Sequence, residues 1–256
     1  MSIKRTAKKP GFEGPGLNCG GEIKMQLLER ELGEISIKAA AMSVAAGEMY
    51  QDAIKALLNH DTELAADVIK RDSLVDMYEL EIDEMCLKFL ALYVPKAMEL
   101  RYVVAVLRFI VEIERVADHS KAVCRQVRDY HCAALLPSLP DFEHILTLTL
   151  RMLREATDTF FERNDQKYEA IIETDKNVGQ LQKSLNASLA ELINVDSGNI
   201  GGAIILLNIV RRVERIGDHA KNIAELVPYV ATGKVIRHKG GSKNLPVSGC
   251  GANEGL

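Results

Sequence analysis

The feature that most constrains the fold of this chain is a ten-residue motif that occurs twice. The chain reads Glu-Arg-Val-Ala-Asp-His-Ser-Lys-Ala-Val at 114–123 and Glu-Arg-Ile-Gly-Asp-His-Ala-Lys-Asn-Ile at 214–223. Glu, Arg, Asp, His and Lys recur at the same positions, and Val116 and Val123 are matched by the apolar Ile216 and Ile223. Each copy lies near the end of a long helical pattern. The motif therefore indicates an internally duplicated helical protein.

Six segments with a helical pattern of apolar residues make up most of the chain. The apolar side chains recur every three or four residues, which is the spacing of a helix that buries one face. The segments lie at 22–58, 63–92, 98–132, 141–161, 166–193 and 200–230. Short turns between long amphipathic helices favour antiparallel bundles. The sequence therefore predicts an all-α fold of two tandem three-helix bundles.

The same duplication predicts where the repeats begin and end. The helical pattern restarts after Pro137 and Pro140, so we expect the first three-helix repeat at 22–137 and the second at 138–233. Residues 1–21 contain prolines and glycines, and residues 234–256 are rich in glycine, serine and proline. We expect the first of these ends to be a disordered N-terminal segment and the second to be a flexible C-terminal tail.

Composition excludes several classes of protein. The formal net charge of −4 lacks the basic excess of a general nucleic-acid binder. No stretch approaches the ~18 consecutive apolar residues of a membrane span, and no apolar signal-peptide core follows the basic residues near the start. The five cysteines form no Cys-x-x-Cys pair, which is typical of a reducing compartment. We therefore expect a soluble cytoplasmic protein that reaches a membrane only through its partners.

The first motif places two carboxylates where a cation could bind. Glu114 and Asp118 are four residues apart and share one helix face. They continue a stripe of apolar residues, Val104, Leu107 and Val111, that we expect to pack in the core. Partial burial of two like charges is costly, and a cation between them would remove that cost. Oxygen-rich sites suit Mg, Ca or Mn, and imidazole ligands add iron and zinc.

The second helix of each repeat supplies a possible facing pair. Asp72 and Asp76 are again four residues apart, and by register Asp72 corresponds to Asp175 in the second repeat. Asp76 corresponds to Gly179, so the second site has fewer carboxylates unless a neighbour such as Glu173 contributes.

The candidate metal ligands are thus Asp72, Asp76, Glu114 and Asp118 in the first repeat, and Asp175, Glu214 and Asp218 in the second. We expect the second site to be the weaker.

Another interpretation of the motif is a solvated ionic helix face. In that case Glu114 or Asp118 would pair with Arg115 or Lys121 of the same helix. Recurrence of the same charged residues inside a duplication favours a shared function over this interpretation.

The two motif histidines are expected to lie off the carboxylate face. His119 and His219 each follow the motif aspartate by one residue, which turns them about 100° around the helix. We expect them at the surface or behind the primary ligands.

These residues resemble a known family. The duplicated three-helix unit carries E-R-x-x-D-H in its last helix, and the second copy continues into Y-V-A-T-G-K-V-I-R-H at 229–238. Over about residues 25–238 the chain is similar to the PhoU family of bacterial and archaeal regulators of phosphate uptake.

The resemblance implies a function and a cofactor. Family members restrain the Pst phosphate ABC transporter, whose ATPase is a partner, and keep the phosphate-sensing histidine kinase quiet when phosphate is plentiful. They are not enzymes, and they form homodimers or larger oligomers. Multinuclear iron or zinc clusters bound by E(D)-x-x-x-D motifs are implied at the seven carboxylates named above, with Mg or Mn also possible. Gly179 departs from the family pattern.

Two alternatives belong to other classes. One is a carboxylate-bridged metal enzyme in a helical bundle, a class that uses Glu-x-x-His; here the histidine follows the motif glutamate by five residues. The other is a helical scaffold that binds no metal.

Overall fold

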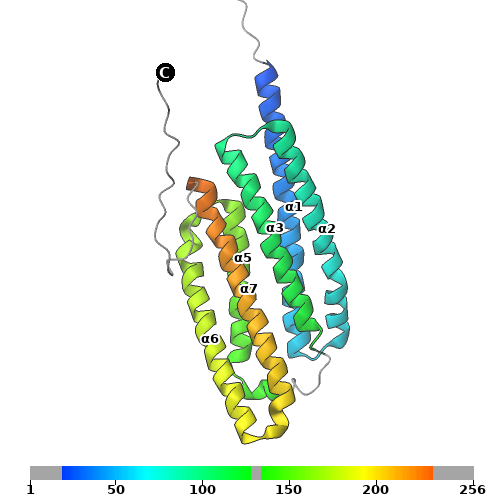
Figure 1. The fold of residues 1–256 in the computed structure, drawn as a ribbon, viewed down its shortest axis with the longest axis vertical. Coiled ribbons are helices and arrows are strands. Elements are labelled where there is room, and N and C mark those ends of the chain that lie inside the picture. The colour runs from blue at the N-terminus through cyan, green and yellow to red at the C-terminus, as the bar shows by residue number, and fades with distance from the viewer. Residues whose placement is uncertain (1–18, 128–133, 233–256) are drawn as a thin grey trace, which may run out of the picture.

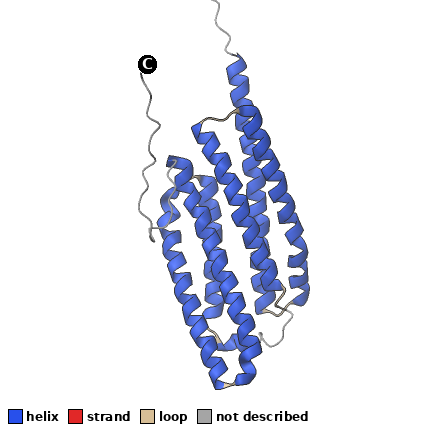
Figure 2. Cartoon of the chain, in the orientation of Figure 1, coloured by secondary structure: helices blue, strands red, loops and turns tan. Residues whose placement is uncertain are grey.

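The fold consists of long helices in two groups of three (Figure 1). The computed structural model describes residues 19–127 and 134–232. The long helices of these ranges are α1 (Cys19–Leu58), α2 (Thr62–Tyr93), α3 (Ala97–Cys124), α5 (Asp141–Glu162), α6 (Tyr168–Val195) and α7 (Ile200–Thr232). Short 3-10 turns occupy Leu136–Ser138, Asp165–Lys167 and Ser197–Asn199. The described ranges contain no strand (Figure 2), so the prediction of an all-α fold is confirmed.

The helix boundaries differ from the predicted ones in a few places. The first helix begins at Cys19 rather than Glu22. The third ends at Cys124, and 125–127 form a turn, so its predicted extension to Cys132 is wrong. The N-cap of α5 is Pro140. Disorder was predicted for 1–21, and this is wrong for 19–21, which are helical. The rest of that segment and the predicted flexible tail at 234–256 lie outside the described residues.

The turn after the first helix has the same form in both repeats. His60 and Arg163 both have left-handed backbone, with φ of 54° and 52°, and each follows the first helix of its repeat. In the first repeat the side chain of Asp61 then accepts hydrogen bonds from the backbone N–H groups of Glu63 and Leu64. Such a cap satisfies free donors at the helix start.

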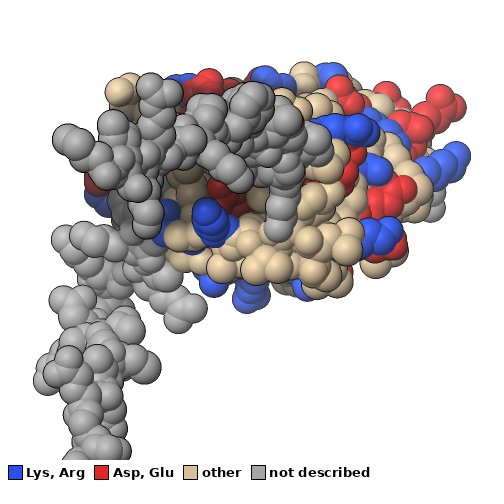
Figure 3. Space-filling model, turned by 90° about the horizontal axis from the view of Figure 1, so that it is seen from above, with Lys and Arg blue, Asp and Glu red and all other residues tan. Residues whose placement is uncertain are grey.

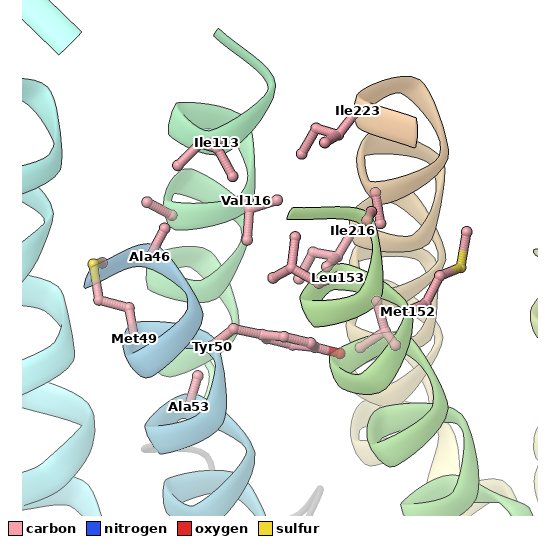
Figure 4. Close-up of a cluster of buried hydrophobic side chains, with 14 of the residues drawn as sticks. Ala46, Met49, Tyr50, Ala53, Ile113, Val116, Met152, Leu153, Ile216 and Ile223 are labelled. Carbon is pink, nitrogen blue, oxygen red and sulfur yellow. The ribbon is translucent and has the colours of Figure 1, made fainter. Parts of the chain in front are cut away.

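The two repeats pack against each other along two helix pairs. Helices α1, α2 and α3 contact one another, as do α5, α6 and α7, and the groups meet where α3 lies against α7 and α1 against α5. Figure 4 shows the buried side chains between them, including Val116 of α3 and Ile216 of α7. Tyr50 of α1 reaches α5, where its hydroxyl lies 2.6 Å from the hydroxyl of Thr149. The core is therefore shared by both repeats.

The buried face of α3 is not the predicted stripe. Val103, Val106 and Ile110 are buried, whereas Val111 is 44% exposed. Because α3 packs against α1, α2 and α7, its buried face is broad and is centred beside the predicted stripe. The residue row that leads to Glu114 and Asp118 thus runs along the edge of the core, and Ile204 on α7 is likewise exposed.

The surface has no strong bias toward one sign of charge where it can be viewed. On the end of the molecule shown in Figure 3, acidic and basic side chains are interspersed among uncharged ones. Among the described helices, none has an apolar stretch long enough to cross a lipid bilayer.

Candidate metal centre

The predicted carboxylates of the first repeat lie along the contact between α2 and α3. Asp72 is buried on α2, and the side chain of Glu114 on α3 is 18% exposed. The ammonium group of Lys121, the lysine of the motif, forms an ion pair with the carboxylate of Asp72 and lies 3.9 Å from that of Asp118. We call this set, Asp72, Asp76, Glu114 and Asp118, the first station.

The electrostatics of the first station disfavour negative charge. Burial and the neighbouring charges of Asp118 and Glu79 together raise the pKa of Glu114 to about 7, against the opposing effect of Arg115. Burial, followed by the charge of Asp72, also raises the pKa of Asp76. These carboxylates are close enough to repel one another, and they lack enough cationic partners to offset that repulsion. The site therefore favours an added positive charge.

Glu79 is a member of this cluster that the sequence analysis did not include. Burial raises the pKa of Glu79, and the charges of Asp76, Asp83 and Asp118 act on it. The signal was present in the spacing, because Glu79 follows Asp76 by three residues and so lies on the same side of α2.

The second repeat has the same ion pair in the same place. Lys221 of α7 donates to the carboxylate of Asp175 on α6, at 2.8 Å. This pair matches that of Lys121 with Asp72, so the register that relates Asp72 to Asp175 is correct in space as well as in sequence. We call Asp175, Glu214 and Asp218 the second station.

The second station has fewer carboxylates than the first. The two residues that match Asp76 and Glu79 are Gly179 and Gln182, and open space surrounds the position of a Cβ added to Gly179. Burial raises the pKa of Glu214, followed by the charge of Asp218. An open groove of about 480 Å³ adjoins this station and is lined by Gln182, Asn186, Leu207, Asn208, Arg211, Glu214, Arg215 and Asp218.

Glu173 does not make up for the missing carboxylates. Its side chain is exposed and accepts a hydrogen bond from Lys176, 2.6 Å away. The expectation that Glu173 could join the second station is therefore not met.

Ion pairs within α3 give some weight to the ionic-face interpretation. Arg115 lies 3.4 Å from the carboxylate of Glu114 and 3.6 Å from that of Asp118. Arg115 is 55% exposed, and exposed pairs of this kind contribute little to stability. They do not cancel the effect of burial, since the pKa of Glu114 stays raised.

The donors at the stations are chemically suited to a hard or borderline cation. They are carboxylate oxygens on two facing helices, and burial, followed by the charge of a neighbouring carboxylate, raises the pKa of Asp76, Glu114 and Asp218. Within the described residues, however, no three His, Cys, Asp or Glu side chains are already grouped as a metal-binding set. The residue types and the electrostatics fit a metal, and the side chains as placed do not yet converge on one point.

The motif histidines lie between the repeats. The rings of His119 on α3 and His219 on α7 face each other with centroids 5.4 Å apart. Nδ1 of His219 lies 2.6 Å from Oε2 of Glu112, which also accepts a hydrogen bond from Asn222. Both histidines are partly buried at the contact between α3 and α7, so their predicted place at the free surface is wrong.

His119 has a different environment from His219. Burial and the charges of His219, Arg212 and Arg215 together lower the pKa of His119 to about 4. Its imidazole is thus held neutral beside two arginines.

Comparison with known proteins identifies the family. A family model described as the PhoU domain matches this chain twice, over residues 40–127 and 142–227. The phosphate-specific transport system accessory protein PhoU of Serratia marcescens is 33% identical over 225 residues, which are 88% of this chain and 92% of that protein. The protein of the same name from Escherichia coli K12 is 32% identical over 227 residues, 89% of this chain and 94% of that one.

Two crystal structures have the same architecture. PhoU from Pseudomonas aeruginosa superimposes with a TM-score of 0.73 at 29% identity, covering 80% of this chain and 99% of that one. The phosphate transport system regulatory protein PhoU from Streptococcus pneumoniae gives a TM-score of 0.76 at 23% identity, covering 82% and 100%, which shows a shared fold. The domain model spans both repeats, and relatives more than 30% identical align over most of their length, so this chain belongs to the PhoU family.

Proposed function

We propose that this protein is a cytoplasmic, metal-binding regulator of phosphate homeostasis that limits uptake by a phosphate-specific transport system. The observation that carries the proposal is the full-length similarity to relatives named as accessory proteins of that system. The role is regulatory rather than catalytic. It includes keeping the phosphate-responsive histidine kinase inactive when phosphate is plentiful.

A metal at the two stations is the second part of the proposal. Asp72, Asp76, Glu114 and Asp118 would hold it in the first repeat, and Asp175, Glu214 and Asp218 in the second. Iron or zinc in a multinuclear cluster is the leading assignment, with Mg or Mn as the alternative. The bound cations would supply positive charge that offsets the carboxylate repulsion. Since the carboxylates come from two helices, that charge would join α2 to α3 and α6 to α7.

Exposed apolar side chains on α2 supply a surface for a protein partner. Leu80 is 72% exposed, and Met77 and Leu87 are also exposed on this helix. We assign the transporter ATPase and the sensor kinase as the partners, and we expect a homodimer. A regulator of this kind needs no catalytic group, only a helix geometry that its partners recognise.

A genetic experiment tests the regulatory role. In the native host, deleting the gene should raise expression from a phosphate-uptake promoter in high phosphate, and the wild-type gene should restore repression. The double variant Glu114→Gln/Asp118→Asn should restore it poorly, whereas the control Glu84→Gln, on the exposed part of α2, should restore it fully. Unchanged expression after deletion would refute the regulatory role. Full repression by the double variant would show that the regulatory role does not require the metal.

A further inference from the structure

The contact between the repeats contains a pocket whose lining offers hydrogen-bond donors and no carboxylate. Its volume is about 290 Å³, and it is lined by His119, Asn208, Arg211, Arg212 and Arg215. Three of the five residues carry permanent positive charge. Within the described part of the chain, none of these three arginines forms an ion pair.

One of the arginines has a buried donor without a partner. Nε of Arg212 is inaccessible to solvent and makes no hydrogen bond among the described residues. A buried donor on a charged group costs free energy when it is left unpaired. The site is therefore incomplete without an acceptor.

The duplication shows what kind of group is missing. In the other half of the contact, the carboxylate of Glu112 binds His219 and Asn222. The residue that matches Glu112 in the second repeat, one hundred positions later like the motif itself, is Arg212. His119 consequently faces a cation where His219 faces an anion. The charge reversal leaves the second half of the contact without the carboxylate that completes the first.

We propose that this pocket binds a phosphate group, as free inorganic phosphate or as the terminal group of a phosphate monoester. Guanidinium groups bind phosphate through paired N–H donors, and three arginines match a doubly charged tetrahedral anion better than the single charge of a carboxylate. Asn208 adds an uncharged donor at the rim. Burial raises the pKa of Glu214 against the opposing charges of Arg215 and Arg211, and its carboxylate lies outside the residues that line the pocket.

The pocket adjoins the groove of the second station, because Asn208, Arg211 and Arg215 line both. Its lining includes none of the seven predicted metal ligands, and its position between α3 and α7 differs from the contacts of α2 with α3 and of α6 with α7. A negative result for phosphate binding would not contradict the proposed metal sites or the regulatory role. A negative result for either of these would not contradict phosphate binding.

The test is a phosphate titration of the full-length protein in a chloride buffer. Binding is measured by calorimetry and by the rise in Tm that a ligand of the folded state produces. Inorganic phosphate and glycerol 3-phosphate are titrated separately, so that the arm that binds distinguishes the free ion from the esterified group. Arg212→Glu places the protein's own carboxylate opposite His119, as Glu112 does opposite His219. This variant should fold normally and bind phosphate at least about tenfold more weakly.

Arg215→Gln is the second variant, and it should also weaken binding. Arg151→Gln, an exposed arginine on α5 outside the pocket, is the matched control and should bind like wild type. An equal response in wild type and Arg212→Glu would overturn the proposal, as would an equal loss in Arg151→Gln. The titration is repeated after chelator treatment, because phosphate binding that disappears with the metal would belong to the stations and would also overturn it.

Discussion

At the scale of single residues, the two motif lysines explain how the motif positions its carboxylates. Lys121 and Lys221 each pair with the first carboxylate of the neighbouring helix, Asp72 or Asp175. The remaining carboxylates of the motif are left facing one another. Among them, Glu114, Glu214 and Asp218 have raised pKa values, chiefly because of burial. The motif lysine thus forms an ion pair between two helices, and the motif glutamate and aspartate are available to a cation.

The raised pKa of Glu114 predicts how the metal-free protein responds to pH. Its pKa rises from an ordinary value of 4.5 to about 7 on folding, so the folded state binds the proton more tightly between these values. The free energy of unfolding should therefore fall as pH rises from about 4.5 to 7. Urea denaturation of chelator-treated protein across this range measures the slope.

The variant Glu114→Gln should have a shallower slope, because an amide does not titrate. The control Glu84→Gln changes an exposed glutamate paired with Lys88 and should keep the wild-type slope. A wild-type slope in Glu114→Gln would show that other groups produce the pH dependence.

Spacing along the chain predicted which carboxylates share a helix face, but not which charges pair between helices. Asp72 and Asp76, like Glu114 and Asp118, are four residues apart, and that spacing fixes their common side. Lys121 lies three residues after Asp118, so a pair within its own helix was equally compatible with the sequence. The observed partner is Asp72, and this choice depends on how α2 lies against α3.

At the scale of helices, the two copies of the motif differ by a glycine that the packing tolerates. Gly217 of α7 matches Ala117 of α3. A Cβ added to Gly217 would lie 3.5 Å from a methyl group of Val178 and 3.6 Å from that of Thr149. These are ordinary van der Waals distances, so the contact of α7 with α5 and α6 has room for a methyl group.

Gly217→Ala should stabilise the protein. Alanine in a helix interior is favoured over glycine by about 1 kcal/mol, so the free energy of unfolding should rise by about 0.5–1 kcal/mol. Gly217→Leu should lower it instead, since the larger side chain would displace its neighbours. Denaturant melts of both variants measure the free energy of unfolding. A destabilised Gly217→Ala would mean that α7 cannot accept the methyl group.

Gly179 offers a test of the difference between the stations. The space around it is open, and Gly179→Asp restores the carboxylate that Asp76 supplies to α2. We expect this variant to bind more metal at the second station, measured by elemental analysis against wild type. The serine variant Gly179→Ser is the control for the change of backbone and should not raise the metal content. No gain in Gly179→Asp would show that the missing carboxylate does not limit the site.

The helical pattern predicted the number and order of the long helices, because buried faces impose a period that survives in the sequence. It did not predict the end of the third helix. Val127 follows Cys124 at the helical spacing of three residues, and the backbone nevertheless leaves the helix after Cys124. It also misplaced the core of α3, since a helix packed on three neighbours buries more than one stripe.

At the scale of the whole molecule, the two repeats form one structure with a common core. Buried residues from α1, α3, α5 and α7 contribute to it (Figure 4), and the stacked rings of Phe109 and Phe160 join α3 to α5. The duplication alone could not place the repeats relative to each other, because two bundles can meet on many faces. The contact between His119 and His219 was therefore beyond prediction from either motif.

A shared core predicts cooperative unfolding. Ile216 is fully buried on α7 near the contact with α3, and Ile216→Ala should cost about 2–5 kcal/mol. The whole transition should shift in calorimetry and in far-UV circular dichroism, with no part left at the wild-type Tm. Two separated transitions, of which only one moves, would show that the repeats unfold independently.

The central claim is that the duplicated motif builds two unequal carboxylate stations for metal. The most direct test is the metal content of the full-length protein purified without chelators, compared with Glu114→Gln/Asp118→Asn and with Glu214→Gln/Asp218→Asn. We predict metal in the wild type, loss of most of it in the first variant, and loss of a smaller part in the second. Equal and near-zero metal in all three proteins would contradict the claim.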